Sequence, residues 1–285
     1  MSQHTLFGRF QRIDLIAALV FPVLTACGGG SGSSVDMPAR PISVSLFAGY
    51  PLGEGNQDGP TSTTASFSNS VQGMALTSSG DVIIADTNNN LIRKLSADYQ
   101  TVTTLAGSRV PLSATSDAPT SYLDGTGSDA RFDHPAAVAV DAAGNTYVAD
   151  SGNHLVRKIS PAGVVTTLAG QAGVCGSQDG VGSAASLCNP IGITSSKTGI
   201  VYVLERFPDT GKRQVRKITP EGRVSKLDLN LQDIWVTALA TDSAGTLFFA
   251  EFSGISLSNR LLRYDANDQV TVVADMSSFG AISNL

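Results

Sequence analysis

The sequence has few cysteines, histidines, tryptophans and charges. Its 285 residues include three Cys, three His and one Trp, and 15% are charged. The formal net charge is −5, and losing Arg9, Arg12 and Asp14 with a cleaved leader makes it one unit more negative. This balance argues against a nucleic-acid-binding protein and against a basic membrane-binding face. Beyond the first residues, no stretch is long and apolar enough to cross a membrane.

Common catalytic patterns are also absent from the sequence. Once the leader is removed, His134 and His154 are the only histidines, and neither has the spacing of a zinc triad. There is no Gly-x-Ser-x-Gly elbow, and no Ser-His-Asp order suggests itself. Asp or Glu side chains near a channel axis could still bind a metal ion, so metal-dependent chemistry is left open. The sequence therefore favours a non-enzymatic role without excluding an enzyme, and any metal ligand is unknown.

Residues 1–26 have the layout of a secretory signal, with basic residues before a short apolar stretch. The stretch ends Leu-Thr-Ala-Cys27-Gly28 and resembles a bacterial lipobox, which implies that Cys27 is lipidated (palmitate) and becomes the mature N-terminus. An ordinary signal peptide or a short anchor with an incidental Cys is the alternative. Residues 27–41 form a Gly/Ser-rich linker. Multiple acyl chains hold a protein stably at a membrane. By the same resemblance, Gly28 directly after the Cys implies retention at the outer membrane.

Cys175 and Cys188 remain after Cys27 is set aside, 13 residues apart in one insertion. An exported compartment permits a disulfide between them. Closing such a loop contributes about 3 kcal/mol in the chain-entropy model. The alternative, a metal pair, lacks nearby His or further Cys.

One motif recurs along the chain. Residues 147–170 read YVADSGNHLVRKISPAGVVTTLAG, residues 83–107 repeat them closely, and fainter copies surround Arg216 and Arg263. Each copy holds four short apolar or β-branched runs broken by Gly, Pro, Asn and Asp, which predict strands A to D. Four such strands make one propeller blade. A repeated unit of this kind cannot bury its apolar face alone, so the copies must stack.

These residues resemble the NHL-repeat β-propellers. The resemblance rests on 150–159 (DSGNHLVRKI), on 135–141 (PAAVAVD), and on 124–132 (DGTGSDARF), which is echoed at 179–187. It covers residues 42–285 and implies an all-β propeller, in a family of mostly binding scaffolds with scattered enzymes. The four predicted blades are 67–107, 132–170, 188–228 and 234–275. Residues 279–285 are predicted to start a further blade.

The two ends of this region do not complete a blade. Residues 42–49 align with strand D, and 279–285 with strand A, so strands B and C are missing. Strands A and D are the inner and outer strands of a blade and do not touch. The sequence therefore predicts about four blades in an open or truncated ring, either as a fragment or as an arc with exposed edges.

The B-to-C loops and the D-to-A connections share one face of such a fold, and the long insertions 108–133 and 171–188 lie there. Functional variation usually concentrates in loops on a rigid scaffold, so this is the expected ligand face. The acids that end strand B are candidate ligands; alternatively, each pairs with the following Arg or caps its own loop. The candidates are Asp86, Asn89, Asp150, Asn153, His154, Glu205, Glu251, Asp124, Asp129 and Asp179.

Two further features have open interpretations. Residues 124–129 have the oxygen density of a Ca²⁺ site without EF-hand spacing, or form a Gly-permitted turn. No other cofactor is predicted. Trp235 either lines a channel, where it stacks on a sugar or peptide, or belongs to the core.

The expected function is a lipid-anchored NHL-type propeller that serves as a binding or interaction scaffold in the bacterial cell envelope. Its ligand is an unknown protein, peptide or glycan, its membrane contact is the lipid anchor, and nucleic acid is not a partner. The alternatives are an envelope hydrolase or lyase of the lactonase-like propeller type with a channel-bound metal, and a structural spacer within a larger surface protein.

Overall fold

A computed structural model describes residues 55–109, 122–229, 235–252, 259–265 and 269–275. The predicted leader, Cys27, the linker, the strand at 42–49 and the strand at 279–285 lie outside these residues. No helix in the described part of the chain is both long and apolar enough to span a bilayer.

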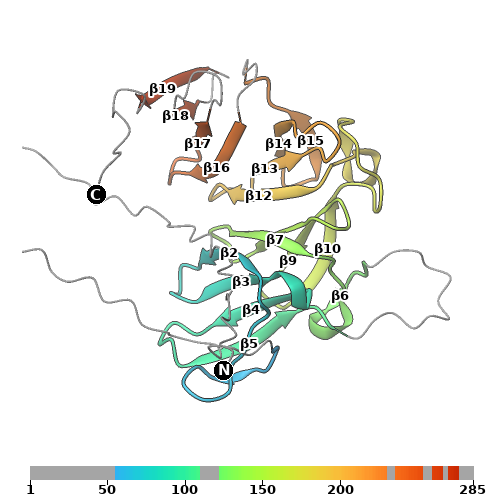
Figure 1. The fold of residues 1–285 in the computed structure, drawn as a ribbon, viewed down its shortest axis with the longest axis vertical. Helices are drawn as coiled ribbons and strands as arrows, with labels where there is room; N and C mark the ends of the chain where they lie inside the picture. Colours follow the sequence, from blue (N-terminus) through green and yellow to red (C-terminus); the bar gives the residue numbers. More distant parts are fainter. Residues whose placement is uncertain (1–54, 110–121, 230–234, 253–258, 266–268, 276–285) are drawn as a thin grey trace, which may run out of the picture. The chain divides into compact units, whose positions relative to one another are not determined.

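The described chain folds into four antiparallel sheets, one from each copy of the repeat (Figure 1). This confirms the all-β class. In chain order the strands are β2 (Val71–Leu76), β3 (Val82–Asp86), β4 (Leu91–Leu95) and β5 (Thr101–Ala106); β7 (Pro135–Val140), β8 (Thr146–Asp150), β9 (Leu155–Ile159) and β10 (Val164–Ala169); β12 (Pro190–Ser195), β13 (Val201–Arg206), β14 (Arg213–Ile218) and β15 (Arg223–Lys226); and β16 (Trp235–Thr241), β17 (Leu247–Phe252), β18 (Asn259–Tyr264) and β19 (Val270–Asp275).

Three of the sheets have five strands, not the predicted four. The additional strands, β1 (Gly59–Pro60), β6 (Gly125–Thr126) and β11 (Gly180–Val181), pair with the outer strands β5, β10 and β15. They are the Asp-Gly segments that precede strand A in the first three sheets. The Asp-Gly signature is therefore an outer edge of its own sheet and not part of a free insertion. Three 3₁₀ helices complete the elements: η1 (Thr87–Asn89), η2 (Gly127–Asp129) and η3 (Gly182–Ala184).

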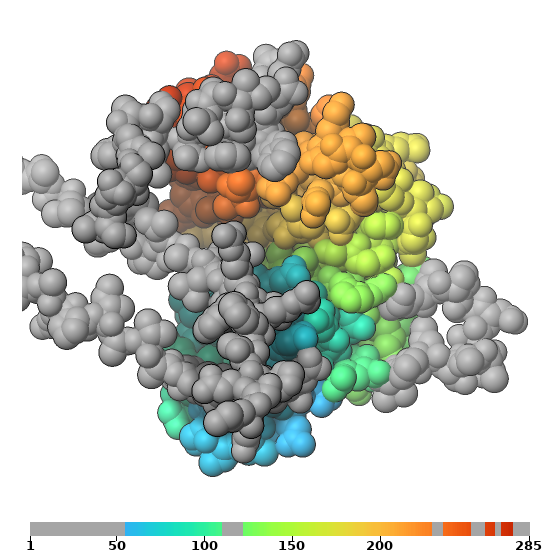
Figure 2. Space-filling model, viewed as in Figure 1, coloured from blue at the N-terminus to red at the C-terminus, as the bar shows by residue number. Residues whose placement is uncertain are grey.

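Neighbouring sheets bury their apolar faces against each other, as expected for stacked repeats. One core cluster joins Ile83 of β3 to Val148 of β8, and another joins Tyr147 of β8 to Val203 of β13. The inner strands also meet in succession, β2 with β7, β7 with β12 and β12 with β16. Figure 2 shows the same succession as adjoining blocks of colour, with the green second sheet between the blue first and the yellow third.

The contact between inner strands requires glycine at one point. A Cβ atom on Gly73 of β2 would lie 2.6 Å from the Cα of Ala137 in β7. No side chain fits in that space, because heavy atoms cannot approach so closely without moving a backbone. Gly73 thus permits β2 and β7 to pack directly against each other.

The fourth sheet departs from the predicted register. In the first three sheets an Arg of strand C pairs with the third residue of strand B, for example Arg157 with Val148. In the fourth sheet that position is Leu262, which pairs with Phe249 and is buried. Arg263, predicted as the equivalent Arg, pairs with Phe248 and is exposed. The prediction for Arg263 is therefore wrong by one residue, and a one-residue shift moves a side chain to the other face of a strand.

Each sheet in the described part of the chain takes its strands from one continuous segment. No sheet there combines strands from near the two ends of the chain, as expected for a ring that does not close.

Candidate functional site

Three arginines lie fully buried in the first three sheets. Arg93, Arg157 and Arg216 stand at the middle or C-terminal half of strand C and have no solvent-exposed side-chain surface. Buried arginines require ion-pair and hydrogen-bond partners, because an uncompensated buried charge is strongly destabilising. Five of the predicted site residues, together with Asp58 and backbone carbonyls, supply those partners: Asp86, Asp124, Asp150, Asp179 and Glu205.

Arg157 shows the full set of contacts. Its Nη1 donates to Asp150 Oδ2 at 3.1 Å and to the carbonyl of Arg131 at 2.9 Å. Its Nη2 donates to Asp124 Oδ1 at 2.7 Å and to the carbonyl of Leu123 at 2.8 Å. Asp150 is fully buried, whereas the Asp124 side chain is 49% exposed. The guanidinium thus links an inner and an outer carboxylate.

The other two arginines repeat this geometry. Arg93 pairs with Asp86 at 3.0 Å and with Asp58 at 2.8 Å. Arg216 pairs with Glu205 at 3.5 Å and with Asp179 at 2.6 Å. Each also donates to two backbone carbonyls, from Ser66, Gln57, Ser186 and Gln178. We call these three groups, each an arginine with its inner and outer acid, the arginine networks.

The outer acid of each network also holds strand D. Asp124 accepts hydrogen bonds from the Thr167 backbone N–H at 3.1 Å and its hydroxyl at 3.0 Å. Asp58 accepts the same pair from Thr104, and Asp179 accepts from the backbone N–H of Lys226. Sequence reasoning missed Asp58, although Asp58-Gly59 precedes Phe67 much as Asp124-Gly125 precedes Phe132, with one residue more between them.

The inner acids also cap their own loops. Asp150 accepts from the backbone N–H of Asp133 at 2.7 Å and from Asn153 Nδ2 at 2.9 Å. Burial raises the pKa of Asp150 to about 6, against the opposing effects of Arg157 and these hydrogen bonds. Asp86 has the equivalent partners Ser68 N–H and Asn89.

Glu205 takes the inner position in the third sheet. It accepts from the Cys188 backbone N–H at 2.9 Å and from Gln214 Nε2 at 2.5 Å, so Gln214 replaces the loop asparagine of the earlier copies. Burial raises the pKa of Glu205 as well. Asp86, Asp150 and Glu205 therefore match the interpretation in which each acid pairs with its Arg and caps its loop.

Glu251, in the fourth sheet, has different surroundings. It is 2% exposed and pairs with Arg260, which lies two residues before Leu262, the residue at the arginine position of the other sheets. Its Oε2 atom is buried, with no hydrogen-bond partner among the described residues. The four strand-B acids thus do not form one equivalent set.

The loop considered for Ca²⁺ contributes to contacts between sheets. Asp129 lies in η2, and the Gly127 N–H donates to the Gly163 carbonyl while the Gly127 carbonyl accepts from Gly107 N–H. Both oxygens of Asp124 already accept hydrogen bonds, which fits a cation site poorly. Within the described ranges, no group of three or more His, Cys, Asp or Glu is placed to hold a metal ion.

His154 connects the second and third sheets. Its Nδ1 accepts the Asn189 backbone N–H at 3.1 Å, so the ring is neutral with the proton on Nε2. Burial lowers the pKa of His154, against the opposing charge of Asp133. At the junction between the first two sheets, the side-chain oxygen of Asn90 accepts the equivalent N–H from His134 at 2.8 Å. His154 is thus a junction residue.

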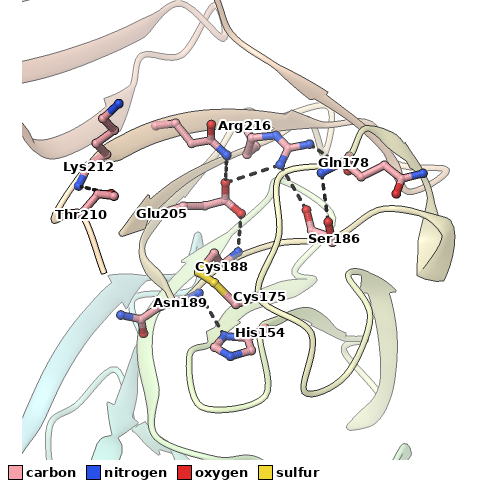
Figure 3. The surroundings of a disulfide bond; sticks show 11 residues. His154, Cys175, Gln178, Ser186, Cys188, Asn189, Glu205, Thr210, Lys212 and Arg216 are labelled. Carbon is pink, nitrogen blue, oxygen red and sulfur yellow. Dashed lines mark hydrogen bonds and ion pairs between the residues drawn. A yellow bond between two sulfur atoms is a disulfide. The ribbon is translucent and has the colours of Figure 1, made fainter. Parts of the chain in front are cut away.

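The predicted disulfide between Cys175 and Cys188 is present. Figure 3 shows it beside His154, with the Cys188 N–H directed at Glu205 and Arg216 bonded to the same carboxylate. The bond therefore ties the insertion before β12 to the arginine network of the third sheet.

A pocket of about 400 Å³ opens at the end of the third sheet. The loop between β13 and β14, the segment after β15 and Val236 of β16 line it. No candidate residue from the sequence lines this pocket. The one signal that could have found it is the longer loop between strands B and C in the third copy.

Comparisons with known proteins identify the repeat. The NHL repeat family model matches residues 69–95 and 132–159. The chain is 32% identical over 172 residues to the protein SUPPRESSOR OF QUENCHING 1, chloroplastic, of Arabidopsis thaliana. That match covers 58% of this chain and spans 15% of the relative's length.

Solved structures with similar folds share little sequence. An auxiliary nutrient binding protein from Bacteroides thetaiotaomicron matches with a TM-score of 0.49 and 12% identity, covering 81% of this chain and 47% of that one. A streptogramin B lyase structure matches with a TM-score of 0.43 and 12% identity, covering 71% and 67%. The family-model match and the observed sheets together show that the chain contains NHL repeats within four stacked antiparallel sheets.

Proposed function

We propose that this protein is an exported, lipid-anchored binding scaffold of the bacterial cell envelope. Its ligand meets the face formed by the B-to-C loops and the D-to-A connections. The arginine networks carry this proposal: they account for the recurring acids Asp86, Asp150 and Glu205 as internal partners of buried arginines. What repeats is then architecture, and the surface loops, which differ between copies, are left for recognition.

The Cys175–Cys188 disulfide supports the exported part of the proposal, because disulfides persist mainly in oxidising compartments. The lipid anchor rests on the lipobox-like sequence at Cys27. Two measurements test it in a bacterial host: incorporation of labelled palmitate, and fractionation of the envelope. The full chain is expected to lie in the membrane fraction and to carry the label. The Cys27→Ala variant is expected to carry no label. Label that remains on Cys27→Ala contradicts the anchor.

Binding is tested with the full chain in a nonionic detergent, used to capture partners from envelope extracts. The informative variant removes residues 110–121, which spares Asp124 and its network. A partner captured by the full chain and lost by this deletion supports the loop face. Equal capture by both chains contradicts a role for that connection.

Metal content separates the scaffold from an envelope hydrolase or lyase. Mass spectrometry of the purified full chain is expected to find no stoichiometric metal. One bound metal per chain, lost together with hydrolase or lyase activity on chelation, contradicts the scaffold proposal.

A further inference from the structure

The third sheet departs from the repeat in the loop between its strands B and C. In the second sheet the last pair across this hairpin is Asp150 with Leu155. In the third sheet Glu205 pairs with Gln214, and an additional pair, Arg206 with Arg213, lies beyond it. The hairpin is therefore longer than in the first two sheets and extends further on the loop face. The fourth sheet has an equivalent additional pair, Phe252 with Asn259, so the two arginines are what distinguishes the third sheet.

The segment that leaves the third sheet departs as well. In the second sheet β10 is followed by Gly170, whose N–H donates to the carbonyl of Gly182. In the third sheet β15 has four residues, where β10 has six, and ends at Lys226. The N–H of the next residue, Leu227, donates to the carbonyl of Val215 at 3.0 Å. These two departures lie side by side and form the walls of the pocket of about 400 Å³.

The pocket has an apolar floor. Val215, Leu227, Leu229 and Val236 line it, and each is at most 7% exposed. All four belong to the core cluster shared by the third and fourth sheets, so the floor is anchored in packed structure. A volume of this size and a mainly apolar lining are typical of small-molecule sites.

The rim of the pocket is cationic. Lys212, Arg213 and Lys226 line it, with Asp228 as the one acid among the lining residues. Lys212 and Lys226 are exposed, and neither ammonium group forms a salt bridge with a described residue. Arg213 Nη1 donates to the Val236 carbonyl at 2.5 Å, which fixes that side chain across the pocket. Burial lowers the pKa of Arg213, and the nearby positive charge of Arg206 lowers it further.

We propose that this pocket binds a small organic carboxylate with an apolar body, the body on the floor and the carboxylate at Lys212 and Lys226. The inference deepens the proposed function, because the pocket opens on the proposed ligand face. Charge complementarity selects an anion over a neutral molecule of the same shape.

Calorimetric titration of the full chain in nonionic detergent, with empty micelles subtracted, tests this pocket. The probes are 3-phenylpropionate and its neutral amide, 3-phenylpropionamide. The carboxylate is expected to bind at least fivefold more tightly than the amide. Lys212→Met with Lys226→Met is expected to weaken carboxylate binding at least fivefold and to leave amide binding unchanged.

Lys217→Met is the matched control, because Lys217 lies on β14 but does not line the pocket. It is expected to bind the carboxylate as the unchanged chain does. Any of three results overturns the proposal: no carboxylate binding at millimolar concentration, equal binding of carboxylate and amide, or equal weakening by the control and the double variant. None of these results bears on lipidation at Cys27 or on partner capture, so the proposed function can fail separately.

Discussion

The second and fourth sheets have the same order of four main strands, but a different buried residue lies at the middle of strand C. In the second, Arg157 is buried between Asp150 and Asp124, and the Asp124 segment adds a fifth strand. In the fourth, Leu262 occupies the arginine position, and the described residues of that sheet include no fifth strand. Among the described residues, the arginine, its outer acid and the outer strand thus occur together in the first three sheets and are all missing from the fourth. Replacing a buried ion pair by a packed apolar residue is an established way to keep a fold stable.

The largest expected effect comes from placing leucine at the arginine position of the second sheet, as in the fourth sheet. Arg157→Leu leaves Asp150 buried without its cation, and a broken buried pair costs about 3–5 kcal/mol. Urea denaturation should show this loss in the free energy of unfolding. The control is Arg263→Leu, at an exposed position, which should change it by no more than about 0.5 kcal/mol. Similar small effects for both variants would remove the distinction between the two sheets.

Removal of the disulfide should have the next largest effect. Cys175→Ala with Cys188→Ala is expected to lower the free energy of unfolding by about 3 kcal/mol, because the loop of the unfolded chain is no longer closed. Denaturation of the oxidised chain and of the double variant measures the difference. A stability equal to that of the unchanged chain would show that the insertion before β12 is held by other contacts.

The outer acid should matter less than the arginine, because it is half exposed. Asp124→Asn weakens the bonds to Arg157 and Thr167 and should cost about 1–2 kcal/mol. Asp129→Asn, in the same loop, should cost no more than about 0.5 kcal/mol, since Asp129 has no part in the network. Addition of Ca²⁺ is expected to stabilise neither chain. Calcium-dependent stabilisation that Asp124→Asn abolishes would favour a cation site instead.

The smallest effect concerns the junctions, where His154 replaces the Asn90 of the first sheet. The lowered pKa of His154 means that the folded chain favours the neutral ring. The contribution of His154 to stability is therefore fully present above about pH 6.5. It falls as the pH drops below that value, because the unfolded chain takes up a proton before the folded chain does. The raised pKa of Asp150 acts with the opposite sign between about pH 4 and 6.

The comparison with His154→Asn isolates the histidine, because Asp150 is present in both chains. Denaturation at pH 7.5 and 5.5 should show a larger loss of unfolding free energy for the unchanged chain than for His154→Asn. Identical pH dependence in the two chains would show that the Asn189 contact does not depend on the protonation of His154.

The repeat predicted the sheets well, because strand patterns and glycine turns are local signals. The pairing of Cys175 with Cys188 also followed from spacing. Arg263 was misplaced because the fourth copy keeps an arginine in sequence but shifts it by one residue, and only the pairing of β17 with β18 reveals the shift. Asp124 and Asp179 gave no local sign of their partners, because each bonds to an arginine more than 30 residues away.

A double-mutant cycle between Asp124 and Arg157 tests the central claim, that these residues form one structural unit. Asp124→Asn, Arg157→Leu and the double variant are compared by urea denaturation. The account predicts that Asp124→Asn costs little once Arg157 is gone, with a coupling energy of about 1–2 kcal/mol. Additive losses, with no coupling, would contradict it.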